Sequence, residues 1–159
     1  MTVGSTQFDE LVAAAASVEV QEALRGRGFG RMTIQFGAGK APFADEAEDA
    51  GRPLACSWYR YKPSLADDMR RAHLVVSHAG YGCLIEALSL RKPVVAVVNR
   101  RLMDDHQREI ADHLQRHRYA LQATPETLAD AIATADFDAR EMLPDAVPQK
   151  YAQFIDGIM

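Results

Sequence analysis

The sequence predicts an α/β protein, with a Rossmann-like parallel sheet flanked by helices. Short runs rich in β-branched residues alternate with segments of helical period, which is the rhythm of parallel strands joined by crossover helices. Runs such as VVAVV (94–98) also lack a polar alternation, as expected of strands that are covered on both faces. These two observations set the fold class.

The expected elements follow in chain order. Met1 to Val3 precede the turn signal GST, so the first strand is only a stub, and a helix is expected over 11–24. Residues 37–53 carry many glycine, alanine and acidic residues without a period and indicate a long surface loop. Further strands are expected at 32–36, 57–61, 74–77 and 94–98. Further helices are expected to begin at Ser64, Gly82, Asp105 and Thr127.

Length and composition restrict the organisation and the partners of the chain. The 159 residues, 48% of them hydrophobic, are enough for one well-packed core, so residues 1–159 are expected to form a single domain. The net charge is −4 and the 18 Lys and Arg do not form a basic block, which argues against nucleic acid as a partner.

Cysteine content and hydropathy indicate a cytoplasmic location. There are two cysteines, and the N-terminus has neither the basic nor the apolar region of a signal peptide. No apolar run approaches the ~20 residues that span a bilayer. Membrane contact is therefore expected only through a partner.

A loop able to bind phosphate is expected between the strand 74–77 and the next helix. Its residues His78, Ala79, Gly80, Tyr81 and Gly82 follow the carboxyl end of the strand, where open α/β sheets bind ligands. The glycines allow a close backbone approach to an anion, and free N–H groups at a helix start attract phosphate. The imidazole could donate a further hydrogen bond.

Glu86 and two other segments extend this site to a nucleotide sugar. The Glu86 carboxylate, one turn into the helix, is placed to accept hydrogen bonds from ribose hydroxyls. Gly4, Ser5 and Thr6 form a second loop on the same edge of the sheet, able to contact a diphosphate or simply to cap a helix. His106 and Gln107 open a helix after the strand 94–98, where an amide suits sugar hydroxyls.

Three other motifs have simpler interpretations. His113 and His117 are spaced like zinc ligands but lack the remaining ligands, so they are expected to be surface residues. The sequence DFD (136–138) is interpreted as a solvated turn, since it does not follow a strand. Cys83 falls among apolar helix residues and is expected to be an inert thiol, although it lies beside the phosphate loop.

The string HAGYGCLIE (78–86) resembles the donor-binding, C-terminal half of GT-B glycosyltransferases. Plant UDP-sugar transferases carry His, Gly, an aromatic residue and Glu in the same order and spacing. The family's Gly-x-Gly-Ser is here Gly80-Tyr81-Gly82-Cys83, which removes one hydroxyl near the diphosphate. The resemblance also assigns Cys83 to the substrate site, His106 and Gln107 to the sugar, and Tyr61 to the uracil side, although Tyr61 could equally pack a strand end.

Nearly the whole chain is similar to the catalytic subunit of the two-subunit dolichol-pathway UDP-GlcNAc transferases. The matching segments are TVGSTQFDELV, YRYKPSLADDMRRAHLVVSHAG, KPVVAVVN and LMDDHQREIADHL. The resemblance implies transfer of GlcNAc from UDP-GlcNAc to dolichyl-diphosphate-GlcNAc at the cytosolic face of the endoplasmic reticulum. A membrane-anchored subunit would bind the acceptor and supply the catalytic base, and neither a cofactor nor a metal would be required.

Other functions stay open at this point. A bacterial exopolysaccharide transferase has the same split architecture, and a non-catalytic nucleotide-sugar sensor would carry the same loops. A sugar-nucleotide epimerase would need a complete two-domain active site, which 159 residues do not provide.

The C-terminus is expected to form an amphipathic helix over 148–159. Pro148 suits a first helical turn, and apolar residues recur at i, i+3, i+4 and i+7. The apolar stripe could cap the core of this domain or bind the partner subunit.

Overall fold

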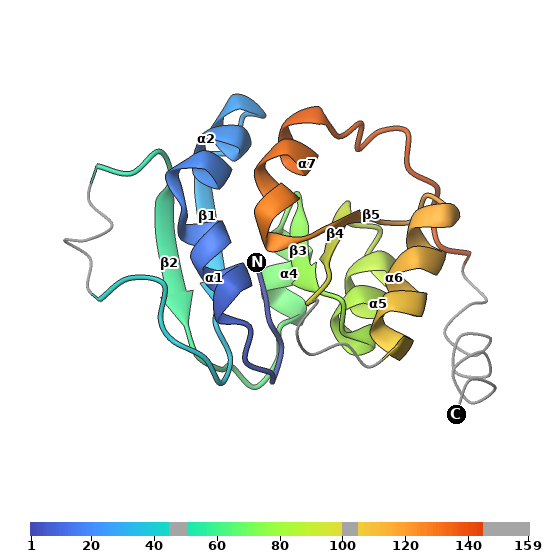
Figure 1. Cartoon of the computed structure of the whole chain (residues 1–159), viewed down its shortest axis with the longest axis horizontal. Helices are drawn as coiled ribbons and strands as arrows, with labels where there is room; N and C mark the ends of the chain where they lie inside the picture. The colour runs from blue at the N-terminus through green and yellow to red at the C-terminus, as the bar shows by residue number, and fades with distance from the viewer. Residues whose placement is uncertain (45–50, 100–104, 145–159) are drawn as a thin grey trace.

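The computed structural model describes residues 1–44, 51–99 and 105–144, and shows a parallel β-layer between two layers of helices (Figure 1). The helices are α1 (Asp9–Ala16), α2 (Val18–Gly26), α4 (Ala66–Arg71), α5 (Tyr81–Ser89), α6 (Asp105–Arg116) and α7 (Leu128–Thr134), with the 3₁₀ turn η1 at Pro125–Thr127. The strands are β1 (Arg31–Gln35), β2 (Ala55–Tyr59), β3 (Val75–His78), β4 (Val94–Val97) and β5 (Leu121–Ala123). The predicted fold class is confirmed.

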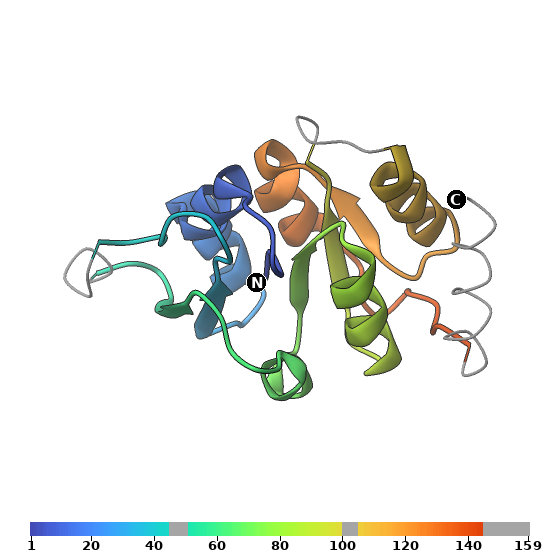
Figure 2. The same ribbon diagram turned by 90° about the horizontal axis from the view of Figure 1, so that it is seen from below.

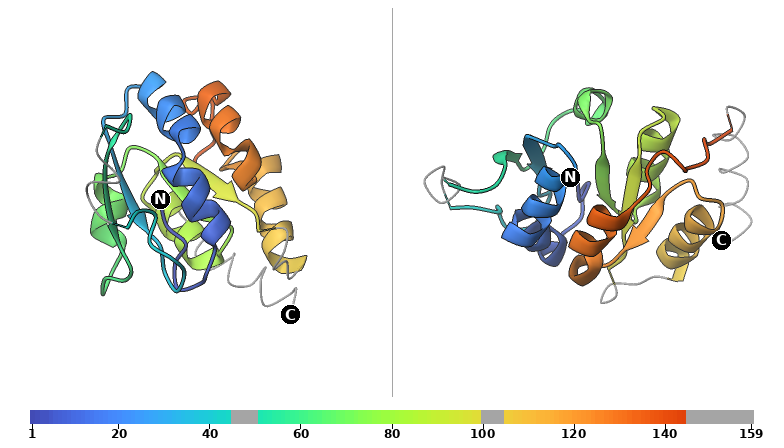
Figure 3. Two further views of the ribbon diagram at one scale, coloured as in Figure 1. Left: turned by 60° about the vertical axis from the view of Figure 1, so that its left-hand side comes forward. Right: turned by 90° about the horizontal axis from the view of Figure 1, so that it is seen from above.

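The N-terminal stub joins the two halves of the sheet. β1 pairs with β2, and β4 lies between β3 and β5, with every pairing parallel. Thr2 bridges in parallel to Gln35 on one side and to Ser77 on the other. With the stub counted as the first strand, the spatial order is that of the Rossmann fold, and the N-terminus lies inside the sheet (Figures 1 and 3).

The central strands β3 and β4 are buried on both faces, and β4 contributes apolar side chains alternately to two cores. One core contains Val95 and Val97 of β4 with the apolar faces of α1, α2 and α7. The other contains Val94 and Ala96 of the same strand with residues of α4, α5 and α6. Figure 2 shows α1, α2 and α7 on one side of the sheet and α4 and α5 on the other.

Helices far apart in the sequence also pack together within one layer. α2 and α7 lie side by side (Figure 3) and bury Leu24, Leu128 and Ile132 in the same core. α7 therefore packs over a helix from the first half of the chain, which ties the two halves of the sheet into one unit.

The structure corrects three boundaries. The helix expected over 11–24 is two helices, because Ser17 adopts an extended conformation (φ −67°, ψ 153°) and its side chain accepts a hydrogen bond from the Val20 N–H as an N-cap. The strand expected at 57–61 is Ala55–Tyr59. The short edge strand β5 was not predicted, since three residues carry too little pattern.

Candidate functional site

The candidate site lies at the point where the strand order reverses. The stub and β3 are neighbours, and the chain leaves them in opposite directions, toward β1 on one side and β4 on the other. Two loops therefore diverge from the carboxyl ends of these strands, one beginning at Gly4 and the other at Ala79. Such a switch point is where open α/β sheets bind ligands, and the two glycine-containing loops predicted from the sequence both lie there.

Gly4 turns the first loop sharply. Its φ is +63°, a left-handed conformation that favours glycine, and a β-carbon at this position would stand 2.9 Å from Cε1 of His78. Its N–H is bonded within the chain, to Thr2 Oγ1 at 3.0 Å and to Gln35 Oε1 at 2.9 Å. Gly4 therefore shapes the loop, and the exposed Ser5 and half-buried Thr6 carry the groups that a ligand can reach.

His78 occupies the space that the two loops leave between them. Its ring also lies against Gly80, where a β-carbon would stand 2.0 Å from Nε2. Burial lowers the pKa of His78, so the imidazole is neutral near pH 7. Nδ1 is buried and has no hydrogen-bond partner among the described residues. A buried, unpaired imidazole nitrogen between two ligand loops is available to a further hydrogen-bonding group.

The start of α5 is better suited to an anion than the start of α1. α1 begins with Asp9 and Glu10, and the backbone N–H of Lys40 and the amide of Gln7 lower the pKa of Asp9. α5 has no acidic residue in its first turn and no side-chain cap at Gly80. Because a carboxylate repels an anion and a free helix N-terminus attracts one, an anion is favoured at the start of α5 over the start of α1. Gly82 is exposed there, with no heavy atom within 4 Å of a β-carbon built on it.

Cys83 and Glu86 lie on the face of α5 that turns toward the first loop. The Cys83 sulfur is 3.4 Å from the β-carbon position of Gly4. The thiol shares hydrogen bonds with the side chains of Thr2 and Ser77. Burial and then the nearby Glu86 carboxylate raise the pKa of the Cys83 thiol. The thiol therefore stays protonated, as expected for an unreactive cysteine. Glu86, one turn further along, is half-buried and shares this face.

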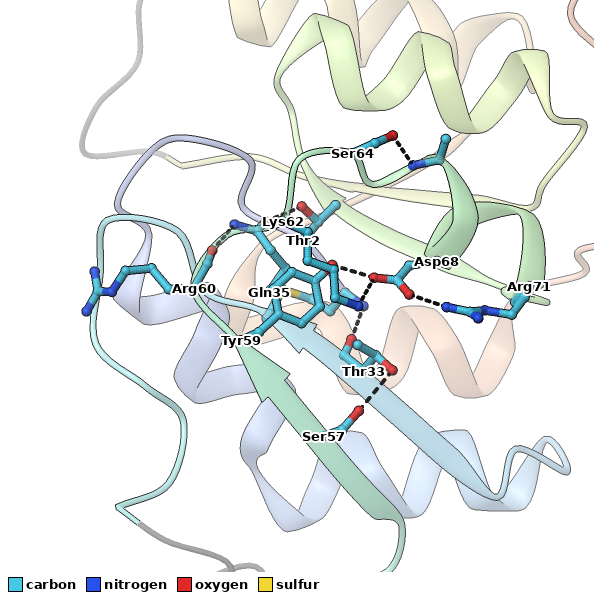
Figure 4. Close-up of polar contacts among 12 residues, drawn as sticks. Thr2, Thr33, Gln35, Ser57, Tyr59, Arg60, Lys62, Ser64, Asp68 and Arg71 are labelled. Carbon is cyan, nitrogen blue, oxygen red and sulfur yellow. Dashed lines mark hydrogen bonds and ion pairs between the residues drawn. The ribbon is translucent and has the colours of Figure 1, made fainter.

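The segment after β2 is held by an ion-pair cluster around Asp68 of α4 (Figure 4). Asp68 accepts hydrogen bonds from Lys62 at 2.8 Å, Tyr59 at 2.5 Å and Arg71 at 2.7 Å. The bond from Lys62 and then the bond from Tyr59 lower the pKa of Asp68 to about 2. Tyr61 lies in the same segment, two residues after the end of β2, with 53% of its surface exposed at the carboxyl edge of the sheet.

Gln35 is a part of this region that sequence reasoning missed. It ends β1 and is 2% exposed, and its side chain forms hydrogen bonds with Gly4 after the stub and with Arg60 after β2. Figure 4 shows Gln35 with Thr2 and Arg60. The available signal was an amide at the end of the otherwise apolar strand MTIQF, immediately before phenylalanine and glycine. Buried amides need several partners, so such a residue marks a hydrogen-bonded junction.

Two predicted segments, His106–Gln107 and residues 148–159, are described only in part or not at all. His106 and Gln107 belong to the first turn of α6, which follows β4 and so starts from the same edge of the sheet, and their side chains are outside what the structure describes. Residues 148–159, predicted as an amphipathic helix, lie outside the described residues. Ala79, by contrast, is buried. Its N–H donates a hydrogen bond to the Val97 carbonyl at 3.0 Å, which anchors the loop after β3 to β4.

The simpler interpretations of the other motifs agree with the structure. Asp136 accepts hydrogen bonds from the N–H groups of Asp138 and Ala139, so DFD is an exposed turn. The rings of His113 and His117 lie 4.4 Å apart, and His117 is exposed. Among the side chains that the structure describes, which exclude residues 45–50, 100–108 and 145–159, no three His, Cys, Asp or Glu are grouped as metal ligands. The described part of the chain contains no helix both long and apolar enough to cross a bilayer.

Comparison with known proteins gives relatives over most of the sequence. A model of the glycosyltransferase family 28 C-terminal domain matches residues 1–156. The UDP-N-acetylglucosamine transferase subunit ALG13 of Homo sapiens is 36% identical over 143 residues, which are 85% of this chain and 12% of the human protein. The subunit of the same name from Eremothecium gossypii is 30% identical over 186 residues, covering 99% of this chain and 91% of that protein. The chain thus spans a small part of the human relative and most of the fungal one.

Solved structures show the same fold. The NMR structure of ALG13 superposes with a TM-score of 0.68 at 23% identity, over 96% of this chain and 91% of that one. The crystal structure of MurG from Acinetobacter baumannii gives 0.60 at 18% identity, over 97% of this chain and 40% of that one. The fold is therefore that of the C-terminal half of a GT-B glycosyltransferase, as predicted. The chain belongs to the glycosyltransferase family 28 C-terminal domain family.

Proposed function

We propose that this chain is the donor-binding subunit of a UDP-GlcNAc transferase. The observation that carries the proposal is the meeting of the Gly4–Thr6 loop and the start of α5 at the switch point, around a neutral buried His78. Relatives named as UDP-N-acetylglucosamine transferase subunits support the choice of donor and the presence of a second subunit.

Each part of the donor would meet a different part of the site. The diphosphate would lie at the start of α5, where backbone N–H groups and the helix dipole stabilise negative charge. The ribose hydroxyls would bond to Glu86, the uracil would lie on the Tyr61 side, and the GlcNAc hydroxyls would reach the amide of Gln107. His78 would add a hydrogen bond to a phosphate oxygen.

This arrangement would assist departure of UDP. When the bond from the anomeric carbon to the diphosphate breaks, negative charge grows on the β-phosphate, and the donors at the start of α5 would stabilise it. The reaction would need no metal for this step, so chelation should leave UDP binding unchanged. The base that deprotonates the acceptor hydroxyl would come from the second subunit.

The proposed acceptor is dolichyl-diphosphate-GlcNAc, which would make the reaction the second step of lipid-linked oligosaccharide synthesis. The acceptor would be bound by a membrane-anchored subunit, which would recruit this chain from the cytoplasm to the cytosolic face of the endoplasmic reticulum. The same donor site would also serve a bacterial-type exopolysaccharide transferase, so the acceptor decides between the two.

Two measurements test the proposal. Calorimetric titration with UDP-GlcNAc, UDP-glucose and ADP-glucose should give tightest binding for UDP-GlcNAc and weakest for ADP-glucose. Mixing the chain with membranes that contain the acceptor subunit should transfer GlcNAc to the lipid acceptor. Binding of UDP-GlcNAc without turnover in the mixture would indicate a nucleotide-sugar sensor, and no binding of any UDP-sugar would overturn the proposal.

A further inference from the structure

Gln35 is a buried amide at the junction of three chain segments. It is the last residue of β1, it is 2% exposed, and its side chain extends beside the stub toward the Gly4 turn. The structure offers a useful comparison, because the chain contains a second buried glutamine, Gln21 of α2, which is 0% exposed.

Every hydrogen-bonding position of the Gln35 carboxamide is used. Oε1 accepts from Thr2 Oγ1 at 2.5 Å and from the Gly4 N–H at 2.9 Å. Nε2 donates to the Gly4 carbonyl at 2.8 Å and to the Arg60 carbonyl at 2.8 Å. A primary amide has two donor hydrogens and two acceptor lone pairs, so four bonds exhaust its capacity.

These bonds fix the backbone of the two segments that follow the strands on either side of β1, namely the stub and β2. Gly4 is held at its N–H and at its carbonyl, which locks the left-handed turn that leads to Ser5 and Thr6. Arg60 is held one residue before the exposed Tyr61. Gln35 thus sets the distance between the loop on the proposed diphosphate side and the segment on the proposed uracil side.

We infer that Gln35 is a positioning residue for the nucleotide, acting through the backbone of Gly4 and Arg60 without touching the ligand. This inference rests on the proposed function, since it assigns the two loops to one UDP molecule. A residue that holds the ligand-binding loops in place without contacting the ligand increases affinity, because the site already has its binding geometry before the ligand binds.

The test compares Gln35→Met with Gln21→Met in the full chain. Gln21 donates to the Ala16 carbonyl at 3.1 Å and accepts from the Leu54 N–H at 3.3 Å. Leu54 immediately precedes β2, so these bonds lie at the amino-terminal edge of the sheet, away from Gln35 at the carboxyl edge. Both variants bury a side chain of similar length without the amide, and both should melt at a lower temperature. Only Gln35→Met should weaken UDP binding, by about 10–100-fold, the range found when groups that orient ligating residues are removed.

Gln35→Glu gives a second readout if the methionine variant does not fold. An ionised carboxylate can accept from Thr2 and Gly4 but has no hydrogen for the two carbonyls that the amide now bonds. Protonation restores one donor, and burial raises a carboxyl pKa into an accessible range. The loss of UDP affinity relative to wild type at the same pH should therefore be smaller at pH 5.5 than at pH 8.

Several results would overturn the inference. Unchanged UDP affinity in Gln35→Met, an equal loss in Gln21→Met, or a loss in Gln35→Glu that does not vary with pH would each show that Gln35 contributes only to folding. Failure of the wild-type chain to bind UDP is a different result. It would overturn the proposed function, and this inference with it.

Discussion

The imidazole of His78 lies against the backbone of Gly4, so closely that a β-carbon at position 4 would stand 2.9 Å from Cε1. His78 comes from the end of β3 and Gly4 from the end of the stub, so this contact closes the switch point between the two halves of the sheet. The absence of a side chain at position 4 is therefore what allows the two loops to converge.

Replacing Gly4 with alanine should separate the loops. The left-handed backbone costs about 1–2 kcal/mol with any L-residue, and the methyl group must also displace the His78 ring. Gly28→Ala is the matched control, because Gly28 has φ +87° but nothing within 4 Å of its β-carbon position. Both variants should lose thermal stability, and only Gly4→Ala should weaken UDP binding, by about tenfold or more. Equal UDP affinity in the two variants would remove Gly4 from the site.

Most of the fold could be predicted because its signals are local. The uniformly apolar run VVAVV predicted a strand covered on both faces, and both faces of β4 are buried. The glycines and histidine of residues 78–82 predicted a loop at the carboxyl edge of the sheet, and the structure places these residues at the end of β3 and the start of α5. These patterns depend on neighbouring residues alone, so no tertiary information was needed.

The two features that were missed have different causes. Ser17 divides one predicted helix into two by capping the second helix through the nearby Val20 N–H, and the apolar period that continues through Ser17 hid this local break. The role of Gln35 depends on contacts with the distant residues Thr2, Gly4 and Arg60. Spacing along the chain does not predict these contacts, because the sequence does not show which distant residues meet.

Glu86→Ala should weaken UDP binding by ~1.5–3 kcal/mol, the range for hydrogen bonds to a charged group, without unfolding the chain. The reason is the proposed pair of bonds from the ribose hydroxyls to a carboxylate that shares a helix face with Cys83. Glu22→Ala, at an exposed position of α2, is the control for removing a helical glutamate. Calorimetry that finds the same UDP affinity in both variants would exclude the ribose assignment.

Gln107→Ala should weaken binding of UDP-GlcNAc and leave UDP binding unchanged. Gln107 lies in the first turn of α6, beyond the end of β4, and its amide is proposed to contact only the sugar hydroxyls. Parallel titrations with UDP and UDP-GlcNAc provide the internal control within one variant. Equal losses for the two ligands would place Gln107 at the nucleotide instead.

Tyr61→Ala should reduce the preference for uridine over adenosine diphosphates. Tyr61 is 53% exposed and lies between Arg60, whose carbonyl is held by Gln35, and Lys62, whose Nζ pairs with Asp68, so its ring is expected to offer a well-positioned surface for a base. Tyr61→Phe keeps the ring and should keep the preference. The measurement is the ratio of UDP to ADP affinity, and a ratio that is the same in Tyr61→Ala as in wild type would remove Tyr61 from the base site.

Deleting residues 148–159 should abolish binding to the membrane-anchored subunit while the remaining domain stays folded and binds UDP-GlcNAc. The residues that form the two described cores all lie within residues 3–143, so the domain is expected to fold without this segment. An apolar stripe on a terminal helix is a typical surface for binding to a helix or groove of a partner protein. It would also bring an acidic chain of net charge −4 to a lipid substrate.

Two serine variants of the full chain separate the stripe from the segment as a whole. The first replaces the apolar positions Tyr151, Phe154, Ile155 and Ile158, and the second replaces the polar positions Lys150, Gln153 and Asp156. Only the first should lose the partner in co-purification from detergent-solubilised membranes, because burial of apolar area drives association and solvated polar positions contribute little. Thermal melting and UDP-GlcNAc titration of both variants measure the domain itself. If the first variant or the deletion unfolds, the helix belongs to this domain's core, and if either still co-purifies with the partner, another surface makes the contact.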